Sequence, residues 1–130
     1  ADDFWGEYAW QVWDSQFRKV FPTGPYPYID LPKNHPIFNQ FFSIARFPQI
    51  PSIGWWRGSG GGTSERLADS SVPHARAVVD DHGRIMALIT HNTDFGDSFE
   101  EEATDHEYFL EFSVKGYAFG INALLYAMSH

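Results

Sequence analysis

The sequence predicts an α/β domain built on a mixed sheet with flanking helices. Two apolar runs, residues 75–79 and 85–89, have the length and near-continuous apolar character of strands buried on both faces. Residues 80–84 between them have the composition of a hairpin turn, with a glycine free to take a positive φ. Helical periodicity marks both ends of the chain, over residues 10–20 and 107–128. Helices together with strands in one short chain favour the α/β class.

The first helix is predicted by four large apolar side chains that fall on one helical face, Trp10, Trp13, Phe17 and Val20. The prolines and the glycine of residues 22–27 end it. Asp2 and Asp3 stand just before this helix, a position that normally follows a strand in a βα unit. One of them suits the role of N-cap, but two adjacent acids exceed what one cap needs.

The middle of the chain is rich in turns. Residues 26–31 are predicted to form a short strand, and the aromatic segment 35–44 a short helix or an irregular segment packed on the core. Residues 57–74 are predicted to be a flexible Gly/Ser loop, because they have little apolar content to offset the entropy of ordering. Their glycine run is not a phosphate-binding loop, since no Gly-Lys-Ser/Thr follows it.

The last helix is predicted to pack closely on its neighbours through a stripe of small residues spaced four, three and four apart, Gly116, Gly120, Ala123 and Ala127. Each glycine inside a helix costs about 1 kcal/mol relative to alanine. Close approach of the helix to a sheet or another helix is the expected compensation.

Composition bounds the function. A chain of 130 residues with 43% hydrophobic and 18% aromatic content makes one domain, residues 1–130, with a substantial core. A net charge of −8 without a basic stripe argues against nucleic-acid binding. The lack of cysteine excludes disulfides, thiolate zinc sites and cysteine nucleophiles. No apolar run approaches the roughly 18 residues that a membrane-spanning helix needs.

Polar side chains follow the apolar run 85–89 where the predicted strand ends, and Asp2 and Asp3 are predicted to follow another strand end. Ligands of α/β domains bind where neighbouring strands end at the same edge of a sheet. We therefore expect one ligand-binding cluster, made of Asp2, Asp3, His91, Asn92, Asp94 and Asp97.

Three interpretations of this cluster stay open. Carboxylates with one imidazole suit Mg²⁺, Mn²⁺, Ca²⁺ or non-haem iron, which predicts a divalent metal ion held by Asp3, His91, Asp94 and Asp97. Crowded carboxylates raise one another's pKa, which would allow acid–base hydrolysis with His91 as the base. Alternatively, the Asp and Asn side chains satisfy backbone donors of the loop, and the site is structural.

Several motifs in register resemble one family. They are Ala1–Gly6, Phe17–Pro22, Asn34–Phe38, Phe47–Pro51, His91–Asp97, Gly120–Asn122 and Leu125–His130. Together they resemble the bacterial domain-of-unknown-function family 4159 (DUF4159). The resemblance implies a flavodoxin-like, class I glutamine amidotransferase-like fold of which this chain is the C-terminal half. It also implies an exported or membrane-associated protein. Amidotransferase activity is excluded, because no cysteine is present to attack glutamine.

A sheet that lacks its other half exposes an edge and an apolar face. We therefore expect a non-catalytic binding or assembly module, a subunit of a larger bacterial complex that is periplasmic or membrane-associated. Other protein subunits are the expected partners, with membrane association only through them or through a missing N-terminal segment. The alternative is a divalent-metal-binding protein or a metal-dependent hydrolase that uses the cluster above.

Overall fold

The computed structural model describes all 130 residues and has a three-stranded antiparallel sheet at its centre. The strand order is β1 (Ile29–Asp30), β2 (His74–Val79), β3 (Ile85–His91). The predicted hairpin is confirmed, since β2 and β3 are neighbours and Gly83 in their turn has a φ of +77°. A shift of register at Val78/Val79 leaves Met86 as an extra residue on β3, as in a β-bulge.

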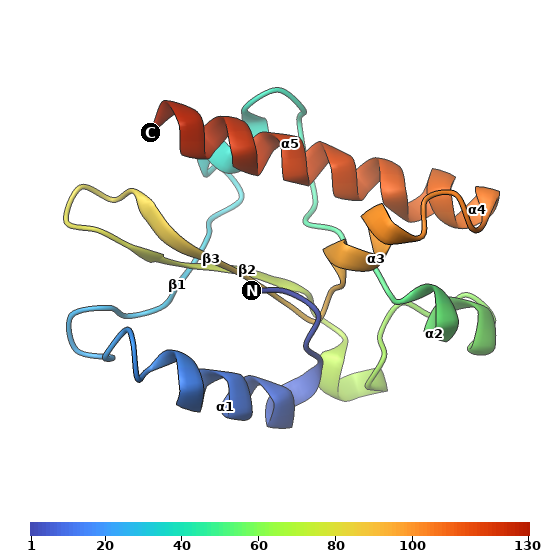
Figure 1. The fold of residues 1–130 in the computed structure, drawn as a ribbon, viewed down its shortest axis with the longest axis horizontal. Helices are drawn as coiled ribbons and strands as arrows, with labels where there is room; N and C mark the ends of the chain where they lie inside the picture. The colour runs from blue at the N-terminus through green and yellow to red at the C-terminus, as the bar shows by residue number, and fades with distance from the viewer.

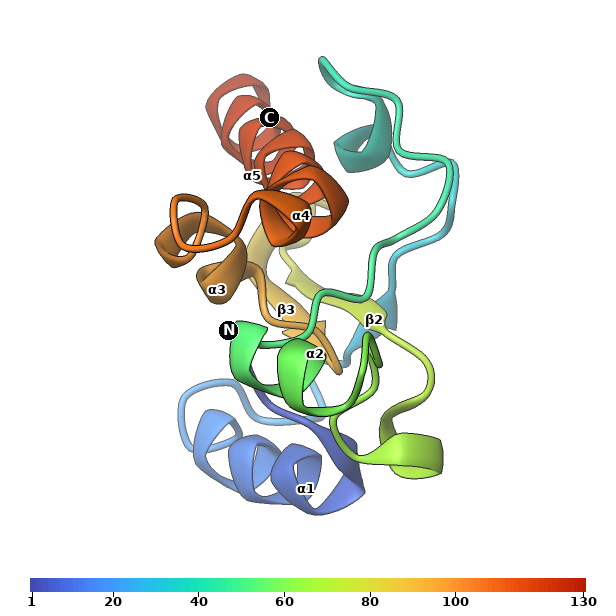
Figure 2. The ribbon, with the colours of Figure 1, turned by 90° about the vertical axis from the view of Figure 1, so that its right-hand side faces the viewer.

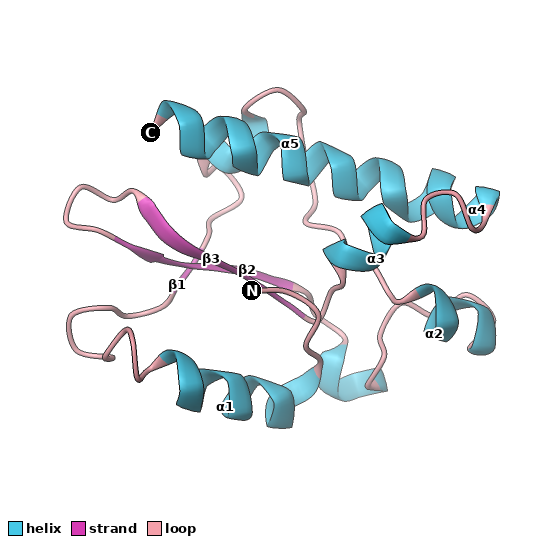
Figure 3. Cartoon of the chain, in the orientation of Figure 1, coloured by secondary structure: helices cyan, strands magenta, loops and turns pink.

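Helices cover both faces of the sheet, which confirms the mixed α/β class (Figures 1 and 3). Helix α1 (Gly6–Phe17) lies on one side, and α3 (Phe95–Glu100) and α5 (Val114–Ser129) lie on the other. Figure 2 shows these layers with the strands between them. The remaining helical segments are short: Pro36–Asn39, α2 (Ile53–Gly58), Leu67–Ser70, α4 (His106–Tyr108) and a π-helical turn at Phe109–Ser113.

The face towards α5 carries the main apolar core, which includes Leu31, Ile37, Phe38, Ala75, Ala77, Phe95 and Phe119. The predicted close packing of the small-residue stripe is confirmed at Gly116. A Cβ added there would come within 1.9 Å of the Ser98 hydroxyl oxygen, so only glycine fits. Asn122 connects α5 to the aromatic segment before it, because its side chain accepts from the backbone N–H groups of Phe41 and Phe42 at 3.0 and 2.9 Å.

The face towards α1 is filled by a layer of half-buried aromatic rings instead of aliphatic side chains. Trp13 stacks on Phe4 and Phe17, with ring centroids 5.3 and 4.6 Å apart. Arg76 of β2 lies over the Trp10 ring at 4.3 Å. Val20 does not join this layer, because the helix ends at Phe17 and leaves Val20 71% exposed.

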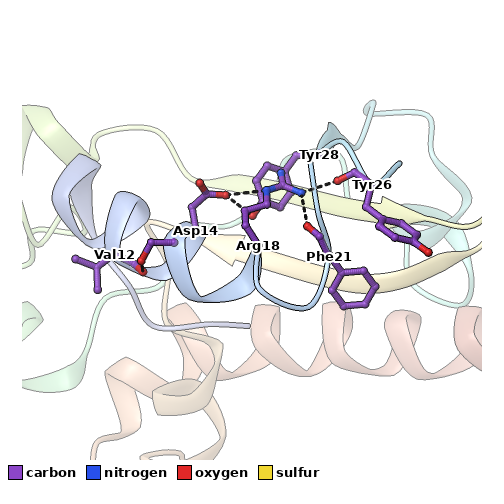
Figure 4. Close-up of polar contacts among 7 residues, drawn as sticks. Val12, Asp14, Arg18, Phe21, Tyr26 and Tyr28 are labelled. Carbon is purple, nitrogen blue, oxygen red and sulfur yellow. Dashed lines mark hydrogen bonds and ion pairs between the residues drawn. The ribbon is translucent and has the colours of Figure 1, made fainter. Parts of the chain in front are cut away.

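Arg18 ties the end of α1 to the following segment (Figure 4). Its Nε donates to Asp14 at 3.0 Å, and its Nη1 donates to the carbonyl oxygens of Phe21 and Tyr26 at 3.1 and 2.6 Å. The guanidinium also lies 3.6 Å from the centroid of the Tyr28 ring. The chain that leaves α1 is therefore folded back towards β1.

The prediction of a mixed sheet is only partly met, because all three strands are antiparallel. A parallel pattern occurs only at the outer edge of β3, where the Ala1 amino group donates to Leu88 O at 2.8 Å and Ala1 O accepts from Thr90 N–H at 2.9 Å. Residues 1–4 follow this edge up to Asn92, whose N–H donates to Phe4 O at 3.0 Å.

Residues 57–74, predicted as a flexible Gly/Ser loop, contain the end of α2 and the 3₁₀ turn Leu67–Ser70. The Ser70 hydroxyl is buried and accepts from Arg66 N–H at 2.8 Å, and Thr63 donates to Gln49 at 2.9 Å. Hydrogen bonds of hydroxyl groups hold this segment in place, whereas apolar contacts hold the core together. The mobility of the segment stays a prediction.

Candidate functional site

The acidic cluster lies where β3 ends and α3 begins, beside the N-terminal segment. Asp94 is the N-cap of α3, and its Oδ1 accepts from Asp97 N–H at 2.9 Å. Asp2 reaches the same turn, where its Oδ2 accepts from Gly96 N–H at 2.9 Å and its Oδ1 accepts from the Thr90 hydroxyl. The structure thus places Asp2 beside the loop after β3, and ligand binding by these residues stays a prediction.

The other two acids have separate partners. Asp97 Oδ2 accepts from Ile53 N–H at 2.9 Å and thereby connects α3 to the start of α2. Asp3 is exposed, has a φ of +57°, and accepts from the indole N–H of Trp5 at 3.2 Å. Neither Asp2 nor Asp3 caps α1. The first two N–H groups of that helix donate instead to Asn92 Oδ1 at 2.8 Å and to Asp69 at 3.1 Å.

Burial and, to a smaller extent, the charges of Asp3, Asp97 and Asp2 together raise the pKa of Asp94 to about 7, against the hydrogen bond from Asp97 N–H. Only 4% of Asp94 is exposed. Burial also raises the pKa of Asp2, although four hydrogen bonds oppose this change. With a pKa of about 7, Asp94 is partly protonated near neutral pH.

His91 does not face this cluster. It belongs to β3, and its ring lies in the aromatic layer under α1, stacked on Phe4 with centroids 5.1 Å apart. Its Nε2 is 3.1 Å from Gly6 O, and its Nδ1 is 3.4 Å from Arg76 Nη1. Burial lowers the pKa of His91, and the nearby cation Arg76 lowers it further. A neutral ring that donates from Nε2 to Gly6 O fits these partners.

Asn92 connects segments that are distant in sequence through hydrogen bonds. It has a φ of +60° and is 3% exposed. Besides capping α1, the side chain of Asn92 donates to Val72 O at 2.8 Å. The backbone carbonyl of Asn92 accepts from the Gln49 side chain at 3.1 Å. These bonds engage one donor and one acceptor of the side-chain amide, and only 3% of Asn92 is exposed, so the residue presents little surface to a ligand.

The predicted metal set is not assembled. No group of three or more His, Asp or Glu side chains lies close enough to hold a metal ion. Asp94 and Asp97 are neighbours through the α3 cap, but the His91 ring is hydrogen-bonded to Gly6 and Arg76 in the aromatic layer. The pairing of this imidazole with a carboxylate, on which acid–base hydrolysis depends, is likewise missing from its hydrogen bonds.

Sequence reasoning missed two residues that hold this region together, Asp69 and Gln49. Asp69 caps α1 from 62 positions away, and Gln49 donates to the carbonyl oxygens of Ser70 and Asn92 at 2.7 and 3.1 Å. Gln49 belongs to the Phe47–Pro51 motif, but nothing in that motif indicates its distant partners, and Asp69 stands in no motif. Only the tertiary fold brings them to their partners, so no sequence signal could have identified them.

The fold and the site thus define an α/β domain with an acidic strand-end cluster whose carboxylates are engaged by backbone N–H groups. The chain belongs to the family described as "Domain of unknown function (DUF4159)", whose model matches residues 1–128. No curated protein and no solved structure matches the chain.

Proposed function

We propose that the chain is a non-catalytic assembly module, a subunit of a larger bacterial complex that is periplasmic or membrane-associated. The observation that carries the proposal is a stripe of exposed apolar side chains along the C-terminal helical segment. It runs at spacings of four, three, four, three and four residues through Leu110, Val114, Tyr117, Ile121, Leu124 and Met128. We call this set the outer stripe.

The outer stripe lies opposite the side of α5 that packs on the core. At 100° per residue it is centred about half a turn from the buried residues Gly116, Phe119 and Tyr126. A helix that is apolar on both sides is typical of one covered on both sides. The most exposed members are Met128 at 83% and Leu124 at 67%.

The spacing favours another helix as the partner of the outer stripe, because apolar residues alternately three and four apart fit knobs-into-holes packing. The only charged residues from 110 to 130 are Glu111 and Lys115, which pair with each other at 2.6 Å. Without flanking lysines or arginines the stripe does not suit an anionic lipid surface. None of the helices has the length and apolar content of a membrane-spanning segment.

The flavodoxin-like, amidotransferase-like affiliation and the position of the chain as the second half of such a domain are part of the same proposal. They are supported by helices on both faces of the sheet and by the parallel pattern of Ala1 beside β3. The metal-dependent alternative has no comparable support, because the carboxylates bind backbone donors and His91 faces α1.

The test is self-association of the chain, in which the available helix is α5 of a second copy. Sedimentation equilibrium should give a dimer with a Kd in the micromolar range. Leu124→Glu should weaken it about tenfold or more, because it places a carboxylate in the contact. Val20→Glu is the matched control at a 71% exposed site outside the stripe. A monodisperse monomer into the hundred-micromolar range, or equal effects of the two variants, would contradict the proposal.

A further inference from the structure

A cavity of about 560 Å³ shares no lining residue with the acidic cluster or the outer stripe, although the carbonyl oxygen of Val72 in its lining accepts from the Asn92 side chain at 2.8 Å. It opens beside the end of β1 and the start of β2, between residues 44–47 and 71–75. Its volume falls in the range of small-molecule sites, about 300–1,000 Å³. Nothing in the acidic cluster or the outer stripe accounts for it.

The walls of this cavity are apolar and partly aromatic. Leu31, Phe38 and Ala75 are buried members of the main core, and Phe47 packs on Phe38 in an edge-to-face contact with centroids 6.2 Å apart. Val72 at the rim is 57% exposed. The floor is therefore held in place by the core, while the rim is open to solvent.

The charges at the rim are unusual for so acidic a chain, which has 17 acidic and 9 basic residues. Lys33 and Arg46 both line the cavity, and neither forms an ion pair. The cavity is also lined by Asp30, whose carboxylate is already bound by Arg76 Nε at 3.0 Å. Five other cations of the chain do form ion pairs: Arg18, Arg57, Arg76, Arg84 and Lys115.

We propose that this cavity binds a small organic acid with an apolar, aromatic body and one carboxylate. The body fills the space beside Phe38 and Phe47, and the carboxylate lies at the rim between Lys33 and Arg46. The planar guanidinium of Arg46 matches a carboxylate with two parallel hydrogen bonds, and Lys33 adds a mobile positive charge. A neutral ligand of the same shape would leave both cations without a partner.

The experiment is a titration of the ¹⁵N-labelled chain with 4-phenylbutyrate, followed by amide chemical shifts. Saturable shifts are expected at the amides that line the cavity, those of Leu31, Lys33, residues 44–47, Ser71, Val72, His74 and Ala75. The neutral analogue 4-phenylbutanol should bind at least about threefold more weakly, because it lacks the rim ion pairs. Inorganic phosphate, which has charge but no apolar body, should leave the shifts of the cavity floor unchanged.

Variants separate the site from general charge effects. Arg46→Gln should weaken 4-phenylbutyrate about threefold and Lys33→Gln with Arg46→Gln about tenfold, as expected for exposed pairs. Arg66→Gln, which removes an exposed cation outside the cavity, should leave binding unchanged. Shifts that do not saturate, equal binding of acid and alcohol, or equal loss in Arg66→Gln would overturn the proposal. Leu124→Glu tests association alone and should retain binding, so the two proposals fail separately.

Discussion

Replacing Asp94 by Asn should make the chain more stable at pH 8 but not at pH 4. The substitution keeps the side-chain oxygen that accepts from Asp97 N–H at 2.9 Å, so the cap of α3 survives. It removes the charge that burial and three neighbouring carboxylates disfavour. The effect should therefore come from ionisation and not from lost hydrogen bonds.

The direction of the pH dependence follows from the difference between the pKa values of Asp94 in the folded and unfolded chains. The pKa of Asp94 rises from an ordinary value of 3.8 to about 7 in the folded chain. Between these values the folded chain keeps a proton that the unfolded chain has released, so the free energy of unfolding falls as pH increases through this window. The full difference corresponds to about 4 kcal/mol. We expect about 2 kcal/mol, since the loop relaxes and the neighbouring acids share the proton.

The assay is urea denaturation of wild type and Asp94→Asn at a series of pH values from 4 to 8. The difference in unfolding free energy should be close to zero at pH 4 and should grow to its full value above pH 7. Asp81→Asn in the exposed hairpin turn changes the same charge without touching the cluster, and its difference should not grow in this way. A gap between wild type and Asp94→Asn that is equal at pH 4 and pH 8 would refute the reasoning.

Two further predictions concern packing and the end of α1. Gly116→Ala should lower the unfolding free energy by about 1–3 kcal/mol, because its Cβ would collide with Ser98, whereas Gly54→Ala, with nothing within 4 Å, should raise it by about 0.5–1 kcal/mol in the same urea measurement. Arg18→Lys should lower the unfolding free energy by about 1–2 kcal/mol, since lysine cannot reproduce the hydrogen bonds to Asp14, Phe21 and Tyr26. Arg84→Lys should cost less than about 0.5 kcal/mol, because the Arg84 side chain is 58% exposed in its ion pair. Equal losses within either pair of variants would contradict these accounts.

The elements that sequence predicted well are those fixed by local periodicity. The hairpin was predicted because two apolar runs flank a turn whose glycine takes a positive φ, and both features are read within a dozen residues. The C-terminal helix was predicted from its small-residue stripe, and Gly116 confirms why those residues are small. The small-residue stripe does not indicate the outer stripe, because the two lie on different faces of the same helix.

The error at His91 comes from the end of a strand. The prediction ended the strand at residue 89, but β3 continues to His91. Within a strand successive side chains point to opposite faces, so Thr90, which bonds to Asp2, and His91 are necessarily on different sides. Two more residues of strand were enough to separate the imidazole from the carboxylates. Strand ends are set by tertiary contacts, here with Gly6 and Arg76, that the sequence does not display.

The outer stripe and the outer edge of β3 are parts of one surface. Tyr117 of the stripe packs on Phe99 with ring centroids 5.3 Å apart, and Phe99 lines a cavity of about 300 Å³ that extends to Leu88 at the edge of β3. A partner that covers α5 therefore also reaches the edge of β3, where Ala1 forms parallel-type hydrogen bonds with Leu88 and Thr90. Residues 1–4 pair with β3 only from Leu88 to Asn92, and a strand edge left unpaired beside an apolar helix face favours aggregation of an isolated chain. In a complex, the same two features give a partner both backbone hydrogen bonds and apolar contacts, so we expect association to depend on both.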